Sequence, residues 1–361
     1  MLETNVFQPN NHSQWQIGYK AVPPEQEAKL RQLLKTHFGY PEEVITEIKQ
    51  VNETEVNSNN FKIATTRGGF LLRRFLATKD QKIILRTLDL IKSLAKEGVR
   101  VPQVVNSITG EPLIILNDEF YCLFVFTEAN HYQGSKLELE SAGTQVGLLD
   151  QALSNLSTDP KWQQELSLPD QVKELRRYDL AIWQELFTKA RARSETNPDD
   201  QFDRDFIASE SIIMEAVTKT LKAKPLESAW GVVHFDLHPH NFLANGQEIV
   251  AIIDLDSLRY LERLRALAFG LHRLVRQYII FNNLSDYPKA VTKGRELFFA
   301  AYKKVNQIDD QALTHLPYFI RDEALSRLTY AMKDLYFNNN PAWKQDLVKQ
   351  LTNLAEATYF D

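Results

Sequence analysis

Three histidines, an aspartate and an asparagine lie within eight residues, in the segment HFDLHPHN from His234 to Asn241. Side chains of these types are costly to remove from water, so their clustering indicates either chemistry or a tightly specified loop. Two chemistries are compatible with the segment. His234, His238 and His240, together with Asp236, could ligate zinc or a pair of metal ions. Alternatively, only the aspartate and the asparagine bind or react, and the histidines shape the loop.

The metal interpretation is the less favoured of the two. The order H-x-D-x-H-x-H, which starts at His234, matches no common zinc motif, although alternate residues of an extended segment can point the same way. We expect His238 and His240 to flank Pro239 as solvated or turn-capping side chains. A metallohydrolase with histidine ligands is therefore kept only as an alternative.

The spacing of Asp236 and Asn241 favours phosphoryl transfer. The pattern H-x-D-x-x-x-x-N is that of a protein-kinase catalytic loop, in which the aspartate orients an acceptor hydroxyl and takes its proton. Asn241 and Asp254, which follows an apolar run in IIDLDS, are hard oxygen ligands that suit Mg²⁺ better than imidazoles do. Asp256 is expected either to assist a second metal ion or to cap the turn after this strand.

A basic residue for the phosphates is expected earlier in the chain, in the segment FLLRRF. Alternation along a strand turns either Arg73 or Arg74 inward, and an inward arginine needs an anion. Upstream, VNSNNFK is expected to be the loop that covers the phosphates. This segment contains no glycine, so any phosphate cradle must be formed by Ser58, Asn59 and Asn60.

The elements that position these residues differ between the two parts of the chain. Residues 1–127 contain short β-rich segments, which predict a small, mostly antiparallel sheet with one helix at residues 80–97. Gly68 and Gly69 indicate a hairpin between two of the strands. Residues 128–361 are mainly amphipathic segments, which predict a helical second lobe.

Local patterns mark the elements of this second lobe. Ser135 and Glu138 form a capping-box pattern that opens a helix through about Leu156. Asn245 and Gly246 predict a type I′ turn in a hairpin that follows HFDLHPHN. Further helices are expected near residues 169–193, 203–223, 259–282, 287–305, 311–336 and 342–357.

Composition and charge narrow the class of protein. A chain of 361 residues is long enough for two lobes, and its formal net charge of −5 gives no support for nucleic-acid binding. Because Cys122 is the single cysteine, an internal disulfide and cysteine-based zinc motifs are excluded. We expect Cys122 to be a buried thiol. No signal-peptide pattern and no membrane-spanning apolar run is present, so we expect a cytoplasmic protein without membrane contacts.

From about Glu42 to Arg276 the chain resembles the aminoglycoside phosphotransferase and choline kinase superfamily. The resemblance is carried by SNNFKI, GGFLLRRF, GVRVPQVV, SAGTQVGLLDQAL, VVHFDLHPHNFL, IIDLDS and LAFGLHRLV. It implies an α+β, protein-kinase-like fold with a small antiparallel-sheet N-lobe and a mainly helical C-lobe. It also implies an enzyme, a small-molecule kinase that uses ATP and Mg²⁺ to phosphorylate a hydroxyl group.

The resemblance assigns roles to individual residues. It implies that Asp236 is the catalytic aspartate, that Asn241 and Asp254 bind magnesium, and that Arg73 grips the phosphates. His234 is expected to have a structural role only.

Two further segments bear on the ligands. Phe126–Asn130 resembles the hinge whose backbone pairs with adenine, which adds Phe126 and Glu128 to the expected nucleotide contacts. After Asp254 the chain is expected to enter a helix near Arg259, which leaves no long activation loop and disfavours protein substrates.

Three departures from the family pattern bear on activity. Phe235 stands where relatives often have glycine, and Thr87 lies near the register of a glutamate that would pair with the phosphate-gripping residue. Ala266 begins an Ala-Leu-Ala segment in place of an acidic element that would brace the catalytic loop. A nucleotide-binding pseudokinase is therefore a second alternative.

The sequence leaves the acceptor open among amino sugars, neutral sugars, homoserine-like amino acids and choline-like alcohols. Acidic residues of the C-terminal helices, such as Asp322 and Glu323, would suit a cationic acceptor. The same residues are equally compatible with an ordinary helix surface.

Overall fold

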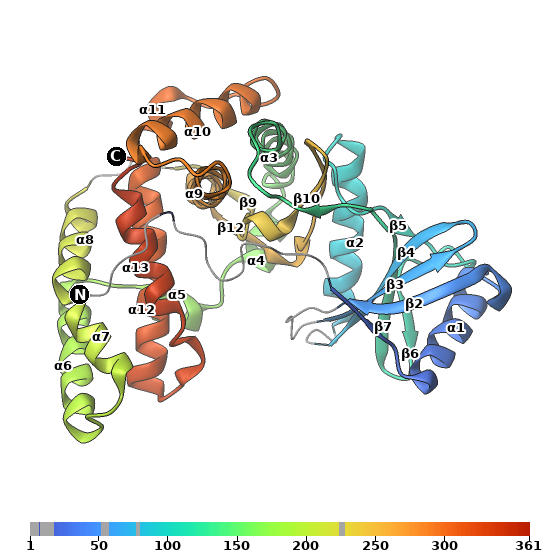
Figure 1. The fold of residues 1–361 in the computed structure, drawn as a ribbon, viewed down its shortest axis with the longest axis horizontal. Coiled ribbons are helices and arrows are strands. Elements are labelled where there is room, and N and C mark those ends of the chain that lie inside the picture. The colour runs from blue at the N-terminus through green and yellow to red at the C-terminus, as the bar shows by residue number, and fades with distance from the viewer. Residues whose placement is uncertain (1–6, 8–17, 52–57, 77–79, 224–227) are drawn as a thin grey trace.

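The computed structural model describes residue 7 and residues 18–51, 58–76, 80–223 and 228–361. Figure 1 shows a β-sheet with its helices at one end of the molecule and a large group of helices at the other. The two-lobed α+β arrangement expected from the sequence is confirmed.

The N-terminal sheet has seven strands in the order β1-β2-β3-β4-β7-β5, and β6 also pairs with β7. All of these pairings are antiparallel. The strands are β1 (Tyr19–Ala21), β2 (Ile45–Val51), β3 (Ser58–Thr65), β4 (Gly68–Phe75), β5 (Val104–Val105), β6 (Ile114–Leu116) and β7 (Glu119–Val125).

The sheet is buried on both faces because a helix packs on each. Phe120, Cys122 and Phe124 of β7 pack in one core with α2 (Gln81–Lys96). The intervening Tyr121 and Leu123 pack in another core with α1 (Pro24–Phe38). Cys122 is a buried thiol, as predicted. This two-sided burial explains why β7 is a continuous apolar run without alternation.

The expectation of one helix in this lobe is wrong, because a second helix, α1, lies between β1 and β2. Pro24 stands in its first turn, and Leu30, Leu33 and Leu34 are buried at helical spacing. Gly39 ends the helix with φ 68°, a conformation that costs glycine little. α2 was predicted correctly, and Asp80 caps it by accepting a hydrogen bond from the Lys82 amide.

Both predicted hairpins are present, but their turns use other residues. Thr65 pairs with Gly68, so Thr66 and Arg67 form the first turn and Gly68 already belongs to β4. Asn245 pairs with Glu248, so the second turn is formed by residues 246 and 247. Only the first of these, a glycine, has positive φ, which rules out the type I′ turn that was predicted.

The expectation of a phosphate-covering loop is wrong for Ser58, Asn59 and Asn60, because these residues begin strand β3. They pair with Phe75, Arg74 and Arg73 of β4. The preceding residues of the segment, 56 and 57, lie outside the described residues.

The second lobe is mainly helical. The predicted capping box is confirmed, with Ser135 and Glu138 closing the start of α3. The helices are α3 (Lys136–Leu156), α4 (Pro160–Leu166), α5 (Asp170–Arg176), α6 (Leu180–Thr196), α7 (Gln201–Ala208), α8 (Glu210–Lys222), α9 (Arg263–Phe281), α10 (Tyr287–Tyr302), α11 (Asp310–Leu313), α12 (Leu316–Asn338) and α13 (Asp346–Ala357). In the described part of the chain no helix combines the length and apolarity needed to cross a membrane.

Two small sheets interrupt the helices. β9 (Trp230–His234) pairs with β12 (Leu258–Glu262), and β8 (Asn130–His131) pairs with the hairpin of β10 (Phe242–Asn245) and β11 (Glu248–Ile252). The chain therefore enters strand β12 after Asp254, and the expectation of a helix near Arg259 is wrong. The helix α9 begins four residues later, at Arg263.

Candidate active site

The segment HFDLHPHN links β9 to β10, and buried His234 fixes its start. The Nε2 atom of His234 lies 3.1 Å from the carbonyl oxygen of Ile253, and its Nδ1 accepts a hydrogen bond of 3.3 Å from the Asp236 amide. Burial lowers the pKa of His234, so the ring is neutral near pH 7. Both ring nitrogens serve the backbone, which agrees with the structural role expected for this residue.

Asp236 is held by His238. The His238 Nδ1 atom accepts a hydrogen bond of 3.3 Å from the His240 amide, so His238 caps the short 3₁₀ turn that starts at Pro239. Its Nε2 atom therefore carries the proton and lies 3.2 Å from Oδ2 of Asp236. Burial by itself would raise the pKa of Asp236, but the His238 hydrogen bond and the charge of Arg327 hold it well below its usual range. The carboxylate is thus ionised and oriented at neutral pH.

Asn241 is buried and ties the loop to the following hairpin. Its Nδ2 group donates a hydrogen bond of 2.7 Å to the Asp236 carbonyl, and its own carbonyl accepts one of 2.9 Å from the Ile253 amide. Because the side-chain nitrogen is used in this way, the side-chain oxygen is the atom left to act as a ligand.

Asp254 follows β11 in a left-handed conformation, with φ 60° and ψ 45°. Its Oδ2 atom accepts a hydrogen bond of 2.9 Å from the Ser257 hydroxyl. A non-glycine residue in this region is unusual outside aspartate and asparagine, and such residues often occur at functional sites. The backbone here turns sharply from β11 toward β12.

Arg73 forms an ion pair with Asp256 and not with a residue of helix α2. The Arg73 Nη2 atom lies 2.8 Å from Oδ2 of Asp256, while Thr87 on α2 hydrogen-bonds to its own helix at Ile83. Arg74 points the other way and pairs with Glu119. The prediction that one of the two arginines turns inward to an anion is confirmed, and the resulting ion pair joins the two lobes.

A cavity of about 150 Å³ lies between the lobes, and we call it the inter-lobe cavity. Its walls combine residues of the sheet with residues from the end of β11. They include Val51, Asn60, Leu71, Arg73, Phe124, Phe126, Thr127, His131, Leu243, Ile253, Asp254 and Asp256. Most of these walls are apolar, as a flat aromatic ring requires, and its charged lining groups are Arg73, Asp254 and Asp256.

The residues expected to contact the nucleotide take different places around this cavity. Asn60, Arg73 and Phe126 line it. Asn59 instead accepts a hydrogen bond of 3.4 Å from Gln50 on β2, and Glu128 is largely exposed and lies 3.7 Å from Lys62. Thr127, which lies within the hinge segment Phe126–Asn130 but was not named among the expected contacts, also lines the cavity.

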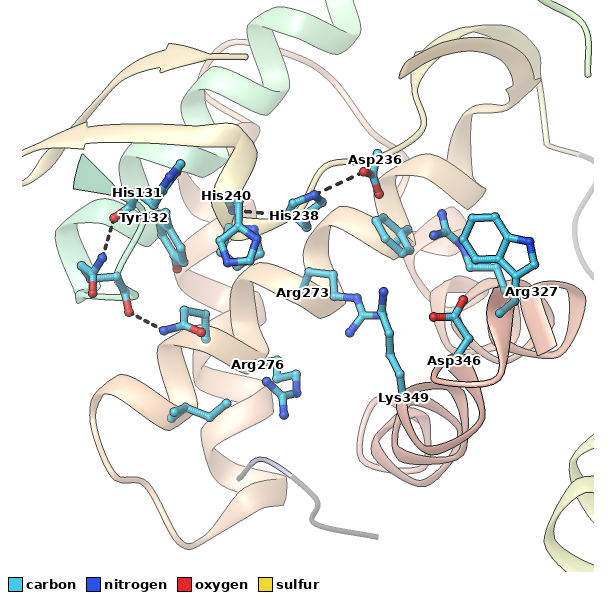
Figure 2. Close-up of a pocket in the computed structure, with 16 residues that line it drawn as sticks. His131, Tyr132, Asp236, His238, His240, Arg273, Arg276, Arg327, Asp346 and Lys349 are labelled. Atoms are coloured by element: carbon cyan, nitrogen blue, oxygen red, sulfur yellow. Dashed lines mark hydrogen bonds and ion pairs between the residues drawn. The ribbon is translucent and has the colours of Figure 1, made fainter. Parts of the chain in front are cut away.

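A second cavity, of about 500 Å³, opens beside Asp236, and we call it the polar cavity (Figure 2). Its lining includes Asp236, His238, His240, Arg273, Arg276, Gln277, Arg327, Trp343, Asp346 and Lys349. The residues from α9, α12 and α13 were not identified in the sequence, because nothing in a helical pattern marks which polar face lines a cavity.

Phe235, at the position where the family resemblance led us to expect glycine, contacts two arginines. The central carbons of the Arg176 and Arg327 guanidinium groups lie 5.2 and 5.1 Å from the centre of its ring. Cation–π contacts of this kind stabilise by about 0.5–2 kcal/mol each. Ala266, where the family resemblance led us to expect an acidic bracing residue, packs against Val233 and Leu261.

Glu323 forms ion pairs with both of these arginines and with Arg265. It is buried, and it pairs with Arg176 at 2.7 Å, with Arg327 at 2.6 Å and with Arg265 at 3.4 Å. Asp322 is also buried and pairs with Arg265 at 2.5 Å. Both suggested roles for this acidic pair are therefore wrong. They are not helix surface, and neither of them lines the inter-lobe or the polar cavity.

Glu323→Gln is expected to lower the free energy of unfolding by about 3–5 kcal/mol, because it leaves buried guanidinium groups uncompensated. Burial alone would raise the pKa of Glu323, but the three arginines lower it from 4.5 to about 2. Its contribution is therefore complete above pH 4.5 and is lost as the pH falls toward 2. Urea unfolding at pH 7 and at decreasing pH measures both effects, and equal stability of variant and wild type at pH 7 would contradict the expectation.

The histidine metal centre finds no support in the described residues, where no group of three or more His, Cys, Asp or Glu side chains is arranged to hold a metal ion. His238 is engaged by Asp236 and by the His240 amide. The expectation that His238 caps a turn is confirmed.

Comparisons with known proteins agree with this geometry. The model of the APH family, described as a phosphotransferase enzyme family, matches residues 47–276. A homoserine kinase of Rhodopseudomonas palustris is 26% identical over 285 residues, which cover 77% of each chain. An aminoglycoside phosphotransferase of Alicyclobacillus acidocaldarius superposes with a TM-score of 0.63 at 15% identity, covering 94% of this chain and 95% of that one. An amicoumacin kinase in complex with AMP-PNP and Ca²⁺ has a TM-score of 0.58 at 15% identity, covering 93% and 94%.

Proposed function

Because the chain belongs to the APH phosphotransferase enzyme family, we propose that it transfers the γ-phosphoryl group of ATP to a hydroxyl group of a small molecule. One observation carries the proposal. A single hairpin presents Asp236 to the polar cavity and Asp254 to the inter-lobe cavity, and His131 lines both cavities. A nucleotide in one cavity and an acceptor in the other would thus meet at this hairpin.

The inter-lobe cavity suits the nucleotide. Its apolar walls fit the adenine, and Val125, Phe126 and Thr127 lie where the sheet connects to the second lobe. We place the boundary between the lobes here, after residue 127, between the end of β7 and the start of β8. Arg73 lines the same cavity beside Asp256, and its permanently charged guanidinium group would bind phosphate oxygens.

The donor set fits Mg²⁺. Asn241 and Asp254 offer an amide and a carboxylate oxygen, the ligand types that this ion prefers. Asp256 pairs with Arg73, so we propose that it positions the arginine for the phosphates and does not itself bind the metal. When bound, the ion would neutralise charge on the phosphate oxygens.

The loop residues would carry out the proton chemistry. Asp236 would accept a hydrogen bond from the acceptor hydroxyl, align it, and take its proton as the new bond to phosphorus forms. His238 would keep the carboxylate in place through its Nε2–H group. Since the pKa of Asp236 is low, the carboxylate is a weak base, and proton transfer would come late.

The family assignment does not identify the acceptor, so the identity of the acceptor is part of our proposal. The relatives named homoserine kinase put L-homoserine first among acceptors to be screened. Amino sugars and amino alcohols complete the screen, because the structural neighbours include an aminoglycoside phosphotransferase and an aminopropanol kinase.

Calorimetric titration of ATP into the metal-stripped protein tests the nucleotide site. We expect binding to strengthen when Mg²⁺ is added. Arg73→Met should weaken it by about 10–100-fold, the effect of losing a charged hydrogen bond. Arg74→Met is the matched control, since Arg74 points to the other face of β4 and pairs with Glu119 of β7. Absence of ATP binding both with and without Mg²⁺ would overturn the proposed function. Binding without turnover of any acceptor would favour the pseudokinase alternative.

A further inference from the structure

The polar cavity carries an excess of positive charge beside Asp236. Helix α9 contributes two arginines, α12 contributes one, and α13 contributes a lysine and an aspartate. These charged lining residues are Arg273, Arg276, Arg327, Lys349 and Asp346. Asp236 adds a carboxylate, but the proposed reaction reserves it for the acceptor hydroxyl. The charge left for the rest of the acceptor is therefore positive.

Two of the cations already have buried carboxylate partners. Arg276 donates from Nε to Glu356 at 2.9 Å, and Glu356 is fully buried. Arg327 donates from Nε to Glu323 at 2.6 Å. Both groups are held in place as part of the protein's own ionic structure, so neither needs a ligand.

Arg273 and Lys349 are different. Among the described residues, no hydrogen-bond partner exists for the buried Nη2 atom of Arg273, and no carboxylate lies within ion-pair distance of either side chain. The guanidinium group of Arg273 instead lies over the ring of Phe269, at 5.3 Å. A buried guanidinium nitrogen without an acceptor is costly, and it points to a partner that binds from outside.

The two side chains also converge. Figure 2 shows Lys349 extending from its helix toward the guanidinium group of Arg273, inside the cavity. Burial lowers the pKa of Arg273 to about 10. The pKa of Lys349 is lowered by the loss of water at the cavity wall and then by the charge of Arg273, although much of the lysine remains exposed. Converging like charges repel, and an anion between them removes both penalties.

We propose that Arg273 and Lys349 bind a carboxylate of the acceptor, which makes the enzyme a kinase of small hydroxy acids. The inference rests on the proposed function for the position of the hydroxyl at Asp236. A planar guanidinium group matches a carboxylate through paired hydrogen bonds, and the lysine adds a second charge. A cavity of about 500 Å³ suits a small molecule of this kind. Cationic acceptors would meet two uncompensated positive charges.

A matched pair of acceptors tests the specificity. L-homoserine and 3-amino-1-propanol share the hydroxyl and the ammonium group, and only the first has a carboxylate. We expect kcat/KM from ADP release to be at least about 100-fold higher for L-homoserine, since a site built to bind a charged group rejects the analogue that lacks it. Arg273→Met and Lys349→Met should each raise the KM for L-homoserine by about 10–100-fold, with kcat and Mg²⁺-ATP affinity retained. Equal turnover of the two acceptors, or an unchanged KM in both variants, would overturn the inference.

Direct binding separates this inference from the proposed function. L-homoserine is titrated calorimetrically into the wild type and into both variants without nucleotide. Binding that is lost in Arg273→Met and retained in Arg191→Met supports the carboxylate site even if no turnover is found. Arg191 lies on α6, pairs with Glu210 and lines neither cavity. Absence of binding to the wild type, or equal binding in Arg273→Met, would overturn it. Lys349→Met provides a second variant, and because Lys349 is exposed we expect the variant to fold.

Discussion

Asp236→Asn is expected to lower kcat for the best acceptor by about 10²–10⁴-fold, the usual contribution of a positioned base. Asparagine keeps the shape of the side chain and can still accept the hydrogen bond from His238. It cannot take a proton from the acceptor hydroxyl. Since Asp236 does not line the inter-lobe cavity, the affinity for Mg²⁺-ATP should stay close to that of the wild type. Steady-state ADP release and ATP titration measure the two quantities on the same protein.

Asp118→Asn is the matched control for this variant. Asp118 is exposed in the turn between β6 and β7, and its positive φ of 60° suits asparagine equally well. The same change of charge is thus made far from the loop. If Asp236→Asn kept kcat within about tenfold of the control, Asp236 would not be the base, and the role of the loop would have to be reassigned.

Asp254→Asn should remove most of the Mg²⁺ dependence of ATP binding and lower kcat/KM by about 10²–10³-fold, because a charged ligand to the metal is lost from a preorganised site. The substitution preserves the backbone, since asparagine also adopts the left-handed conformation seen at φ 60°. ATP titrations at a series of Mg²⁺ concentrations measure the dependence directly.

Asp256→Asn is the control that shows whether the loss of Mg²⁺ dependence is specific to Asp254. Asp256 pairs with Arg73, so its loss should free the arginine and leave most of the Mg²⁺ dependence intact. If the two variants lost the same dependence, both aspartates would be metal ligands. If Asp254→Asn kept the dependence of the wild type, the proposed metal site would be wrong.

The loop and the strands around it were predictable because their signals are local. The spacing of Asp236 and Asn241 fixes a short loop between two strands. The two residues are joined there by a 2.7 Å hydrogen bond from the side-chain amide of Asn241 to the backbone carbonyl of Asp236. The capping box of α3 and the burial of Cys122 are equally local. In each case the determining residues lie within a few positions of one another.

The remaining features depend on contacts between distant parts of the chain. Arg73 and Asp256 are 183 residues apart, so no local pattern could pair them. The same holds for Arg273 and Lys349, which come from different helices and meet only in the folded cavity. Asn59 was misplaced because a polar run resembles a loop, whereas its backbone pairs with Arg74 in the sheet. Tertiary pairing outweighs such weak local preferences.

The contacts of Phe235 with both Arg176 and Arg327 imply a constraint on evolutionary change. A single exchange of the phenylalanine for glycine would leave two guanidinium groups facing a gap, and an exchange of either arginine would leave an aromatic ring uncovered. The three positions should therefore covary among relatives, with phenylalanine accompanied by both arginines and glycine by neither. Double-mutant cycles would show the same dependence as a coupling energy between position 235 and its neighbours.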